Sequence, residues 1–236
     1  MTPFITPCAY PLTLPSGFDQ YWCKYNRDDY RDSLYPTLGI PFPASLNRAV
    51  AKRRAEFLAG RYCAHKALSA LGLGREPVEI GPHGCPLWPR GVKGSISHSR
   101  AWACALVSND PKTRSIGVDI ENIVSEETLE QSRDLVLVRE EHRLLGCDNL
   151  NPRTVFTLLF SLKESFFKSA YPLVGHYFDF DAVTVVHIDT HRQIISFQLN
   201  EQLHAQLPKY TDFQAHYRFL DEDTLATLTL LPGRSS

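Results

Sequence analysis

The sequence predicts an α+β protein built as a pseudo-dimer of two similar lobes, each with a long helix packed on a small, mainly antiparallel sheet. Each half contains one segment with helical hydrophobic periodicity, at residues 45–71 and 154–171. Several short β-branched and aromatic segments flank each helix. We place the boundary at the polar break around Pro111, which gives lobes 1–112 and 113–236.

The composition is that of a globular protein with no general affinity for nucleic acid or membranes. Of its 236 residues 43% are apolar and 22% charged, and the formal net charge is −1. The first residues lack the features of a signal peptide, and no apolar run approaches the ~18 residues of a membrane span. The six cysteines show no CxxC spacing, so we expect reduced thiols and a cytoplasmic protein.

The elements of the first half follow from proline, glycine and periodicity. Residues 1–45 are rich in proline and aromatic residues, which predicts a wrapping segment with short strands. A helix follows, with Ser45 as its predicted N-cap and Gly72 just past its end. Residues 75–94 read as a loop, and 95–98 and 103–107 as two strands joined by a tight turn.

The second half opens with a short strand at 115–121, followed by a charged helical region at 125–147. The long helix at 154–171 is expected to stop at Pro172, which cannot make a normal helical hydrogen bond. Alternation then predicts antiparallel strands at 183–188, 194–197, 215–219 and 225–231.

The strand at 115–121 carries a pair of acidic residues. Side chains alternate along a strand, so Asp119 and Glu121 share one face, and Val118 and Ile120 share the other. Two neighbouring carboxylates suit a hard cation such as Mg²⁺, which keeps water and substrate phosphate as its other ligands. The alternative is a solvated strand edge whose charges prevent aggregation.

Two helical segments carry further charged pairs. Glu164 and Lys168 are four residues apart and share a helix face, although an ordinary surface ion pair would look the same. Arg53 and Arg61 lie two turns apart, a spacing that suits two phosphates of one elongated ligand. The alternative is a solvated basic face. Gly60 is costly within a helix, which indicates close approach by another group.

A polar turn follows the first strand of the 95–107 pair. Ser97 and His98 could donate hydrogen bonds to a phosphate, or His98 could act as a base, and a plain polar turn is the alternative. Adjacent residues project differently and no G-x-S-x-G sequence is present, so a serine hydrolase is disfavoured.

Taken together and in order, these segments resemble the 4′-phosphopantetheinyl transferases. The likeness is to the monomeric, two-lobed type that includes the surfactin- and enterobactin-synthase activating enzymes, with the first motif that of the enterobactin-type branch. It runs from about Arg48 to Phe180 and rests on Arg53-Arg54-Ala55-Glu56-Phe57-Leu58-Ala59-Gly60-Arg61, Trp88-Pro89, Ser95-Ile96-Ser97-His98-Ser99, Gly117-Val118-Asp119-Ile120-Glu121 and Phe160-Ser161-Leu162-Lys163-Glu164-Ser165-Phe166-Phe167-Lys168.

The resemblance implies a reaction. A magnesium ion, or manganese in its place, would be held by Asp119, Glu121 and Glu164. Coenzyme A would be the co-substrate, and a serine of an apo acyl carrier protein or peptidyl carrier domain would attack its β-phosphate. The residues implied to contact coenzyme A are Arg53, Arg61, Ser97, His98, Lys163 and Lys168. Glu164 and Lys168 would be catalytic, with Glu164 as the candidate base.

One loop departs from the family pattern. Surfactin-type members carry a lysine before a proline where this chain has Cys85-Pro86, so either His83 replaces that basic contact or the contact is absent. Two other hypotheses stay open, a magnesium-dependent nucleotide phosphohydrolase and a non-catalytic coenzyme A-binding protein. The paired arginines argue against the first and the complete set of carboxylates against the second.

Overall fold

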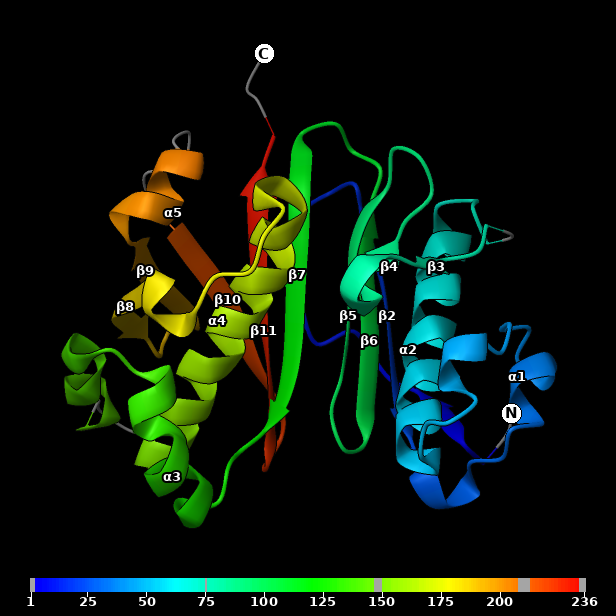
Figure 1. Ribbon diagram of the computed structural model, residues 1–236, viewed down its shortest axis with the longest axis horizontal. Helices are drawn as coiled ribbons and strands as arrows, with labels where there is room; N and C mark the ends of the chain where they lie inside the picture. Colours follow the sequence, from blue (N-terminus) through cyan, green and yellow to red (C-terminus); the bar gives the residue numbers. More distant parts are fainter. Residues whose placement is uncertain (1–2, 75, 147–149, 208–212, 234–236) are drawn as a thin grey trace. The chain divides into compact units, whose positions relative to one another are not determined.

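Helices and antiparallel sheets make up the computed structural model, which describes residues 3–74, 76–146, 150–207 and 213–233 (Figure 1). The predicted α+β class is confirmed. The chain divides into two compact units: the first runs up to Ile116 and includes Pro232, and the second is Gly117–Leu231. This division falls a few residues beyond the expected boundary, and the end of the last strand belongs with the first unit.

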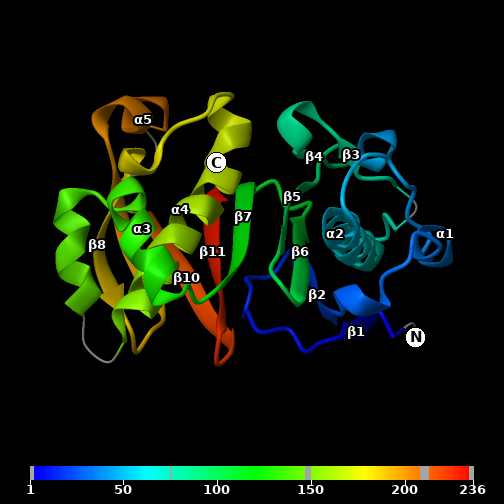
Figure 2. The ribbon, with the colours of Figure 1, turned by 60° about the horizontal axis from the view of Figure 1, so that its bottom comes forward.

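A four-stranded sheet in the order β1-β2-β6-β5 forms the base of the first unit. Its strands are β1 (Ile5–Pro7), β2 (Phe18–Tyr25), β6 (Trp102–Ser108) and β5 (Lys93–His98). Their described pairings are antiparallel, and Ala105 faces Tyr21 on one side and Ile96 on the other. Helix α2 (Ala51–Ala70) covers one face of this sheet (Figure 2). The smaller elements of this unit are η1 (Arg27–Asp29), α1 (Leu34–Thr37), η2 (Ala44–Leu46), β3 (Glu79–Ile80), η3 (Pro82–Gly84) and β4 (Pro86–Leu87).

Helix α2 starts later than predicted. Ser45 lies inside the 3-10 turn η2, whose bonds run from Leu46 N–H to Pro43 O and from Asn47 N–H to Ala44 O. The helix begins at Ala51 after an extended Val50, so the prediction of Ser45 as its N-cap is wrong. The backbone hydrogen bonds of this separate turn replace an earlier start of the helix. The predicted end is confirmed, because Gly72 has φ +76° just after the helix.

The second unit contains a five-stranded sheet in the order β7-β11-β10-β9-β8. Its strands are β7 (Thr113–Asn122), β11 (Thr224–Pro232), β10 (Phe213–Asp221), β9 (Ile194–Leu199) and β8 (Val183–Asp189). The described pairings among β8, β9, β10 and β11 are antiparallel, as predicted. The helices are α3 (Glu126–Val136), η4 (Arg139–Gly146), α4 (Pro152–Val174), η5 (Phe180–Ala182) and α5 (Glu201–Gln206).

Helix α4 continues through Pro172, contrary to prediction. Proline removes one helical donor, but the Gly175 N–H still donates to Tyr171 O at 2.9 Å and closes the last turn. Gly175 then ends the helix with φ 76°. The short helix α5 was not predicted; its N-cap Asn200 accepts a hydrogen bond from Leu203 N–H.

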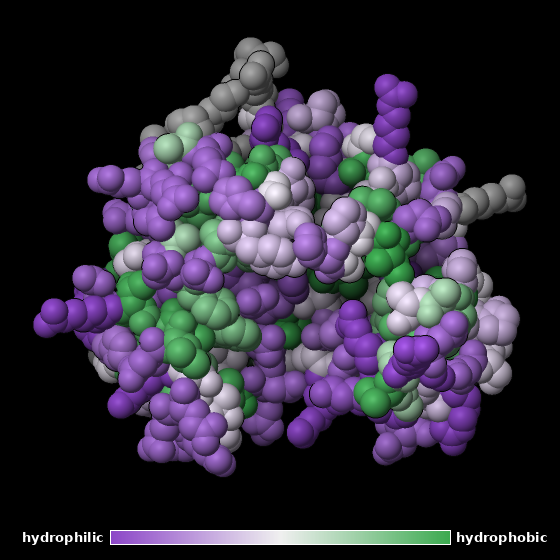
Figure 3. All heavy atoms as spheres, viewed as in Figure 1, coloured by the Kyte–Doolittle hydropathy of each residue, from purple (hydrophilic) through white to green (hydrophobic). Residues whose placement is uncertain are grey.

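Each unit has its own apolar core. In the first, residues of α2 such as Leu58 and Ala64 pack with β-strand residues such as Ala105. In the second, α4 residues such as Leu162 and Phe166 pack with the sheet. Hydrophilic residues cover most of the face in view in Figure 3, with small hydrophobic groups between them. Among the described helices, none combines the length and apolar character that crossing a bilayer requires.

The cysteines in the described part of the chain are free thiols, as predicted: Cys8, Cys23, Cys63, Cys85 and Cys104. Cys147 lies outside the described residues.

Candidate functional site

A glycine brings strand β7 against helix α4. A Cβ added at Gly117 would lie 1.8 Å from Ser165 O and 2.8 Å from Ser169 N, both backbone atoms of α4. Only a residue without a side chain fits there, and φ at Gly117 is not positive, so the requirement is for space. Asp119, two residues further along β7, therefore lies beside α4.

Both oxygens of Asp119 are hydrogen-bonded to α4 side chains. Ser161 Oγ donates to Oδ2 at 2.9 Å, and Lys168 Nζ donates to Oδ1 at 2.6 Å. Lys168 also donates to Val118 O at 3.0 Å. Asp119 is only 4% exposed, so the alternative of a solvated strand edge is wrong for this residue. This short, charge-assisted hydrogen bond to the buried Asp119 links the strand to the helix.

Glu121 and Glu164 complete an acidic cluster. Burial, then the charges of Asp119 and Glu164, raise the pKa of Glu121 to about 8, against the opposing effect of Lys168. Burial and Asp119 likewise raise the pKa of Glu164. The structure thus brings the three predicted carboxylates within electrostatic reach of one another, with Lys168 as a counter-charge among them.

The donor chemistry of this cluster fits a hard divalent cation. Its ligands are all carboxylate oxygens, and a cation would relieve the repulsion that raises their pKa values. In the described part of the chain, however, no three aspartate, glutamate, histidine or cysteine side chains already surround a common metal position. At Asp119, the Lys168 ammonium lies against Oδ1 at 2.6 Å.

Lys163 lies in a different environment from the one expected. Its side chain is 1% exposed, and Nζ donates to Glu141 Oε2 at 2.7 Å and to Val136 O at 2.8 Å. Glu141 is fully buried and also accepts from the N–H groups of Val138 and Val185. The amino group of Lys163 thus joins α4 to α3 and η4, and Glu141 extends the link to β8. This placement does not support the expected contact with coenzyme A.

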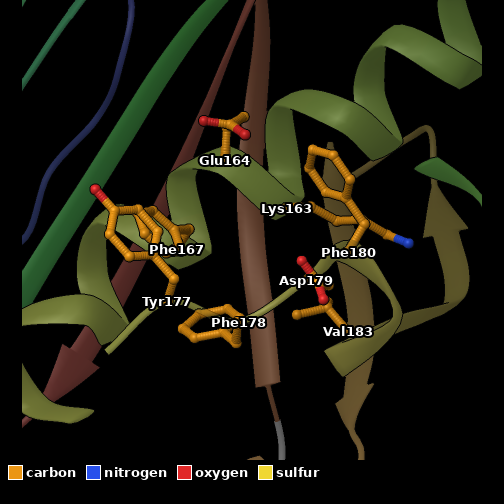
Figure 4. Close-up of a pocket in the computed structure, with 8 residues that line it drawn as sticks. All are labelled: Lys163, Glu164, Phe167, Tyr177, Phe178, Asp179, Phe180 and Val183. Carbon is orange, nitrogen blue, oxygen red and sulfur yellow. The ribbon is translucent and has the colours of Figure 1, made fainter. Parts of the chain in front are cut away.

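A pocket of about 260 Å³ opens beside Glu164. Figure 4 shows the rings of Phe167 and Tyr177 at one end, and Phe180 with Asp179 at the other. Phe167 and Tyr177 are stacked with centroids 5.5 Å apart. The remaining lining comes from Phe178, Val183 and the chain of Lys163. The pocket is mainly apolar with a few polar groups, as is usual for a site that binds a small organic group.

Two of the predicted phosphate-binding residues meet in the first unit. Arg53 Nη1 of α2 lies 3.3 Å from His98 Nε2, at the end of β5. Ile96, on the same face of β5 as His98, has its Cγ2 2.9 Å from where a Cβ at Gly60 would be, so Gly60 allows β5 to approach the helix. The close approach expected at Gly60 is confirmed. Ser97, 4% exposed, points to the opposite face of β5 from His98, so the structure does not bring its side chain into this pair.

Arg61 is set deeper than Arg53. It is 8% exposed, its guanidinium lies 4.9 Å from the centre of the Phe57 ring, and its Nη2 donates to Glu79 O at 3.4 Å. Its Nη1 is buried without a hydrogen-bond partner in the described structure. Burial lowers the pKa of Arg61 to about 10, and Arg53 adds to this. A buried donor of this kind fits an anionic acceptor.

The loop that departs from the family pattern lies near Arg61, since Arg61 donates to Glu79 O of β3, and β3 pairs with β4, which begins directly after Cys85. His83 has φ 56° within the turn η3. Whether His83 replaces the basic contact stays a prediction.

Sequence reasoning missed four residues that support these clusters. Ser161 and Glu141 hold Asp119 and Lys163, and Arg27 pairs with Glu56 beside Arg53. A signal existed for Ser161, which precedes Lys168 by seven residues and so shares its helix face. No local signal exists for Arg27 or Glu141, which come from distant segments.

The chain thus carries a carboxylate cluster suited to a divalent cation and, separately, an arginine–histidine cluster suited to phosphate. Such a combination is typical of the class of proteins that act on phosphorylated ligands. The family model described as the 4′-phosphopantetheinyl transferase N-terminal domain matches residues 42–108, and that of the 4′-phosphopantetheinyl transferase superfamily matches residues 115–225. The chain belongs to the 4′-phosphopantetheinyl transferase family.

Named relatives agree with this assignment. Enterobactin synthase component D of Escherichia coli O157:H7 is 43% identical over 133 residues, which are 56% of this chain and 62% of the relative. The protein of that name from Salmonella typhimurium is 38% identical over 160 residues, 68% of this chain and 65% of the relative. The 4′-phosphopantetheinyl transferase Svp of Streptomyces mobaraensis is 39% identical over 158 residues, 64% and 63%. The chain therefore spans less than two thirds of the length of each.

Proposed function

We propose that this protein transfers the 4′-phosphopantetheine group of coenzyme A to a serine of an apo acyl or peptidyl carrier protein and releases 3′,5′-adenosine bisphosphate. The observation that carries this proposal is the cluster of Asp119, Glu121, Glu164 and Lys168 between β7 and α4. It lies within the segment that matches the superfamily.

Asp119, Glu121 and Glu164 would hold magnesium, or manganese in its place. The metal would neutralise charge on the diphosphate of coenzyme A and on its leaving group. Ser161 keeps Asp119 oriented, since its hydroxyl donates to Oδ2 at 2.9 Å. Such a neighbour fixes a ligand before the ion arrives.

The remaining chemistry falls to Glu164 and Lys168. The serine oxygen forms a bond to the β-phosphorus while the bond from that phosphorus to the oxygen of the adenosine bisphosphate breaks. Glu164 lines the pocket and accepts the serine proton, directly or through water. Lys168, whose Nζ lies 2.6 Å from Asp119, supplies a donor and a positive charge for a phosphate oxygen.

The pocket beside Glu164 would take the pantetheine arm. Phe167, Tyr177 and Phe178 offer an apolar surface, and Asp179 offers an acceptor for an amide N–H of the arm. The Arg53–His98 pair and Arg61 of the first unit would bind phosphate groups of coenzyme A. The side chain of Ser97 faces away from this pair, so its part in the proposal is limited to the backbone at the strand end.

We propose that the two units are pseudo-dimeric repeats of one chain that acts as a monomer in the cytoplasm, a location that suits its free thiols. An acidic carrier helix would dock near Arg139–Arg143. Of these residues, Arg143 is partly engaged, because its Nη2 donates to Val186 O at 3.2 Å. The charge-reversed Arg139→Glu should therefore weaken carrier binding, measured as the KM for the carrier.

The reaction is tested by the intact mass of apo carrier proteins incubated with the full chain, coenzyme A and magnesium. We expect a gain of one phosphopantetheine group, lost with EDTA and in Asp119→Ala. Glu130→Ala, which removes an exposed carboxylate of α3, is the matched control and should transfer normally. Coenzyme A binding without transfer to any fatty-acid, polyketide or siderophore-type carrier would favour a non-catalytic binding protein. Release of a nucleotide without a carrier would favour a phosphohydrolase.

A further inference from the structure

A charged pair in the first unit joins three separate segments next to the Arg53–His98 contact. Arg27, in turn η1, donates from Nη2 to Glu56 Oε1 at 2.8 Å and to Ser99 O at 3.3 Å. Tyr25 OH donates to the same carbonyl at 2.6 Å. Glu56 is 9% exposed, so its carboxylate is largely removed from water and depends on this partner.

The pair is connected through the backbone to both phosphate-binding candidates. Glu56 follows Arg53 by three residues on α2 and therefore lies one turn along the same helix side. Ser99 directly follows His98, and its carbonyl accepts from Arg27. One guanidinium thus ties the helix that carries Arg53 to the strand end that carries His98.

The location of the Arg27–Glu56 pair indicates that it positions Arg53 and His98. Arg53 is exposed and His98 is half-buried, and they lie on different elements, so a 3.3 Å contact between their side chains contributes little to the position of the backbones that carry them. In the Arg27–Glu56 pair the Glu56 side chain is 11% exposed and that of Arg27 is 27% exposed, so removal of Arg27 leaves a largely buried carboxylate without its partner. A phosphomonoester dianion needs two donors at fixed separation, and the Arg27 link holds their backbones at that separation.

We propose that Arg27, held by Glu56, is a positioning residue that sets Arg53 and His98 to bind the 3′-phosphate of coenzyme A. This rests on the proposed function. Coenzyme A carries a diphosphate and a 3′-phosphomonoester, and the carboxylate cluster with its metal accounts for the diphosphate. The second cationic cluster therefore takes the remaining dianion.

The test compares coenzyme A with 3′-dephospho-coenzyme A in steady-state transfer by the full chain. In Arg27→Met we expect the KM for coenzyme A to rise about tenfold, as for loss of one charge-assisted interaction, with kcat nearly unchanged. The KM for the dephospho compound should stay at the wild-type value. Arg27→Lys should recover part of the loss, and Arg31→Met, which removes an exposed arginine of the neighbouring turn, should resemble wild type.

Controls separate this role from stability and from failure of the proposed function. Arg27→Met leaves Glu56 unpaired, so the double variant Arg27→Met/Glu56→Gln, which removes both charges, checks the result in a protein without a buried lone charge. Two results would overturn the positioning role. In the first, the KM of Arg27→Met rises equally for both ligands. In the second, the KM of Arg27→Met does not rise, although Arg53→Met loses selectivity for the 3′-phosphate. If wild type transfers nothing, equilibrium binding of the two ligands gives the same comparison. Equal affinity of wild type for both would then refute the 3′-phosphate assignment.

Discussion

Replacement of Gly117 by alanine tests whether the contact of β7 with α4 builds the carboxylate cluster. The new Cβ would lie 1.8 Å from Ser165 O and 2.9 Å from Ser165 C. Both atoms belong to a helix backbone, so no side chain can rotate away, and strand and helix must separate by about 1 Å or more. Overpacking of this kind costs about 3 kcal/mol, the upper part of its usual range. For a chain of this size that lowers Tm by about 6–12 °C.

The same separation should harm the site more than the fold. Lys168 Nζ and Ser161 Oγ reach Asp119 across the interface that must widen, at 2.6 and 2.9 Å. We therefore expect phosphopantetheine transfer to fall further than the fraction of folded protein explains. The assay is urea unfolding with transfer measured on the folded protein. Gly146→Ala is the matched control, because an added Cβ there meets nothing within 4 Å. A Gly117→Ala midpoint equal to that of Gly146→Ala would refute the reasoning.

Three further predictions concern other titratable groups. Lys163→Met should destabilise the protein by about 3–5 kcal/mol, because it leaves Glu141 buried and unpaired. The double variant Lys163→Met/Glu141→Gln should recover part of the lost stability. Calorimetric unfolding of both variants measures the two effects. Cys23, Cys63 and Cys104 are 0% exposed, and burial raises the pKa of the Cys63 thiol. After alkylation at pH 8, mass spectrometry should therefore find these three cysteines modified only in unfolded protein. Modification of Cys63 in the native state would contradict the prediction. Partial desolvation and Arg218 lower the pKa of His216, so the unfolded chain binds more protons and stability should fall as pH drops below about 6.5. His216→Gln should flatten that part of the profile, and an unchanged slope would count against the prediction.

The fold was predictable wherever a periodic pattern was long. The α4 pattern and the alternating strands from residue 183 onward gave the correct elements because burial on one face leaves a strong signal. The errors lie at ends and short elements. Ser45 formed its own turn, Pro172 was accommodated in a last helical turn, and α5 has only six residues, too few for a period to appear.

For the candidate site, the kinds of residue that lie close together were predictable from the sequence. The motifs supplied the residues, and the structure adds the contacts, in which Lys168 donates to Asp119 and Arg53 meets His98. Helical spacing could have indicated Ser161 as a partner of Asp119, but sequence could not give Arg27 as the partner of Glu56, because the two lie on distant segments. Nor could it tell that Lys163 points inward, since the residue that fixes it, Glu141, lies 22 positions earlier.

The motif Lys163-Glu164…Lys168 shows why a shared pattern of residues need not mean a shared role. At 100° per residue, Glu164 and Lys168 lie about 40° apart around α4, whereas Lys163 lies about 100° or more from both. The structure follows this geometry: Lys168 reaches Asp119 on β7, and Lys163 reaches Glu141 on η4. Burial then separates the roles, because an ammonium that is 1% exposed and bonded to a carboxylate and a carbonyl has no donor directed at solvent, while Lys168 is 29% exposed. Lys163 is thus best understood as the residue that fixes the α4 backbone next to Glu164, so loss of its charge should act on stability first and on transfer only through the position of Glu164.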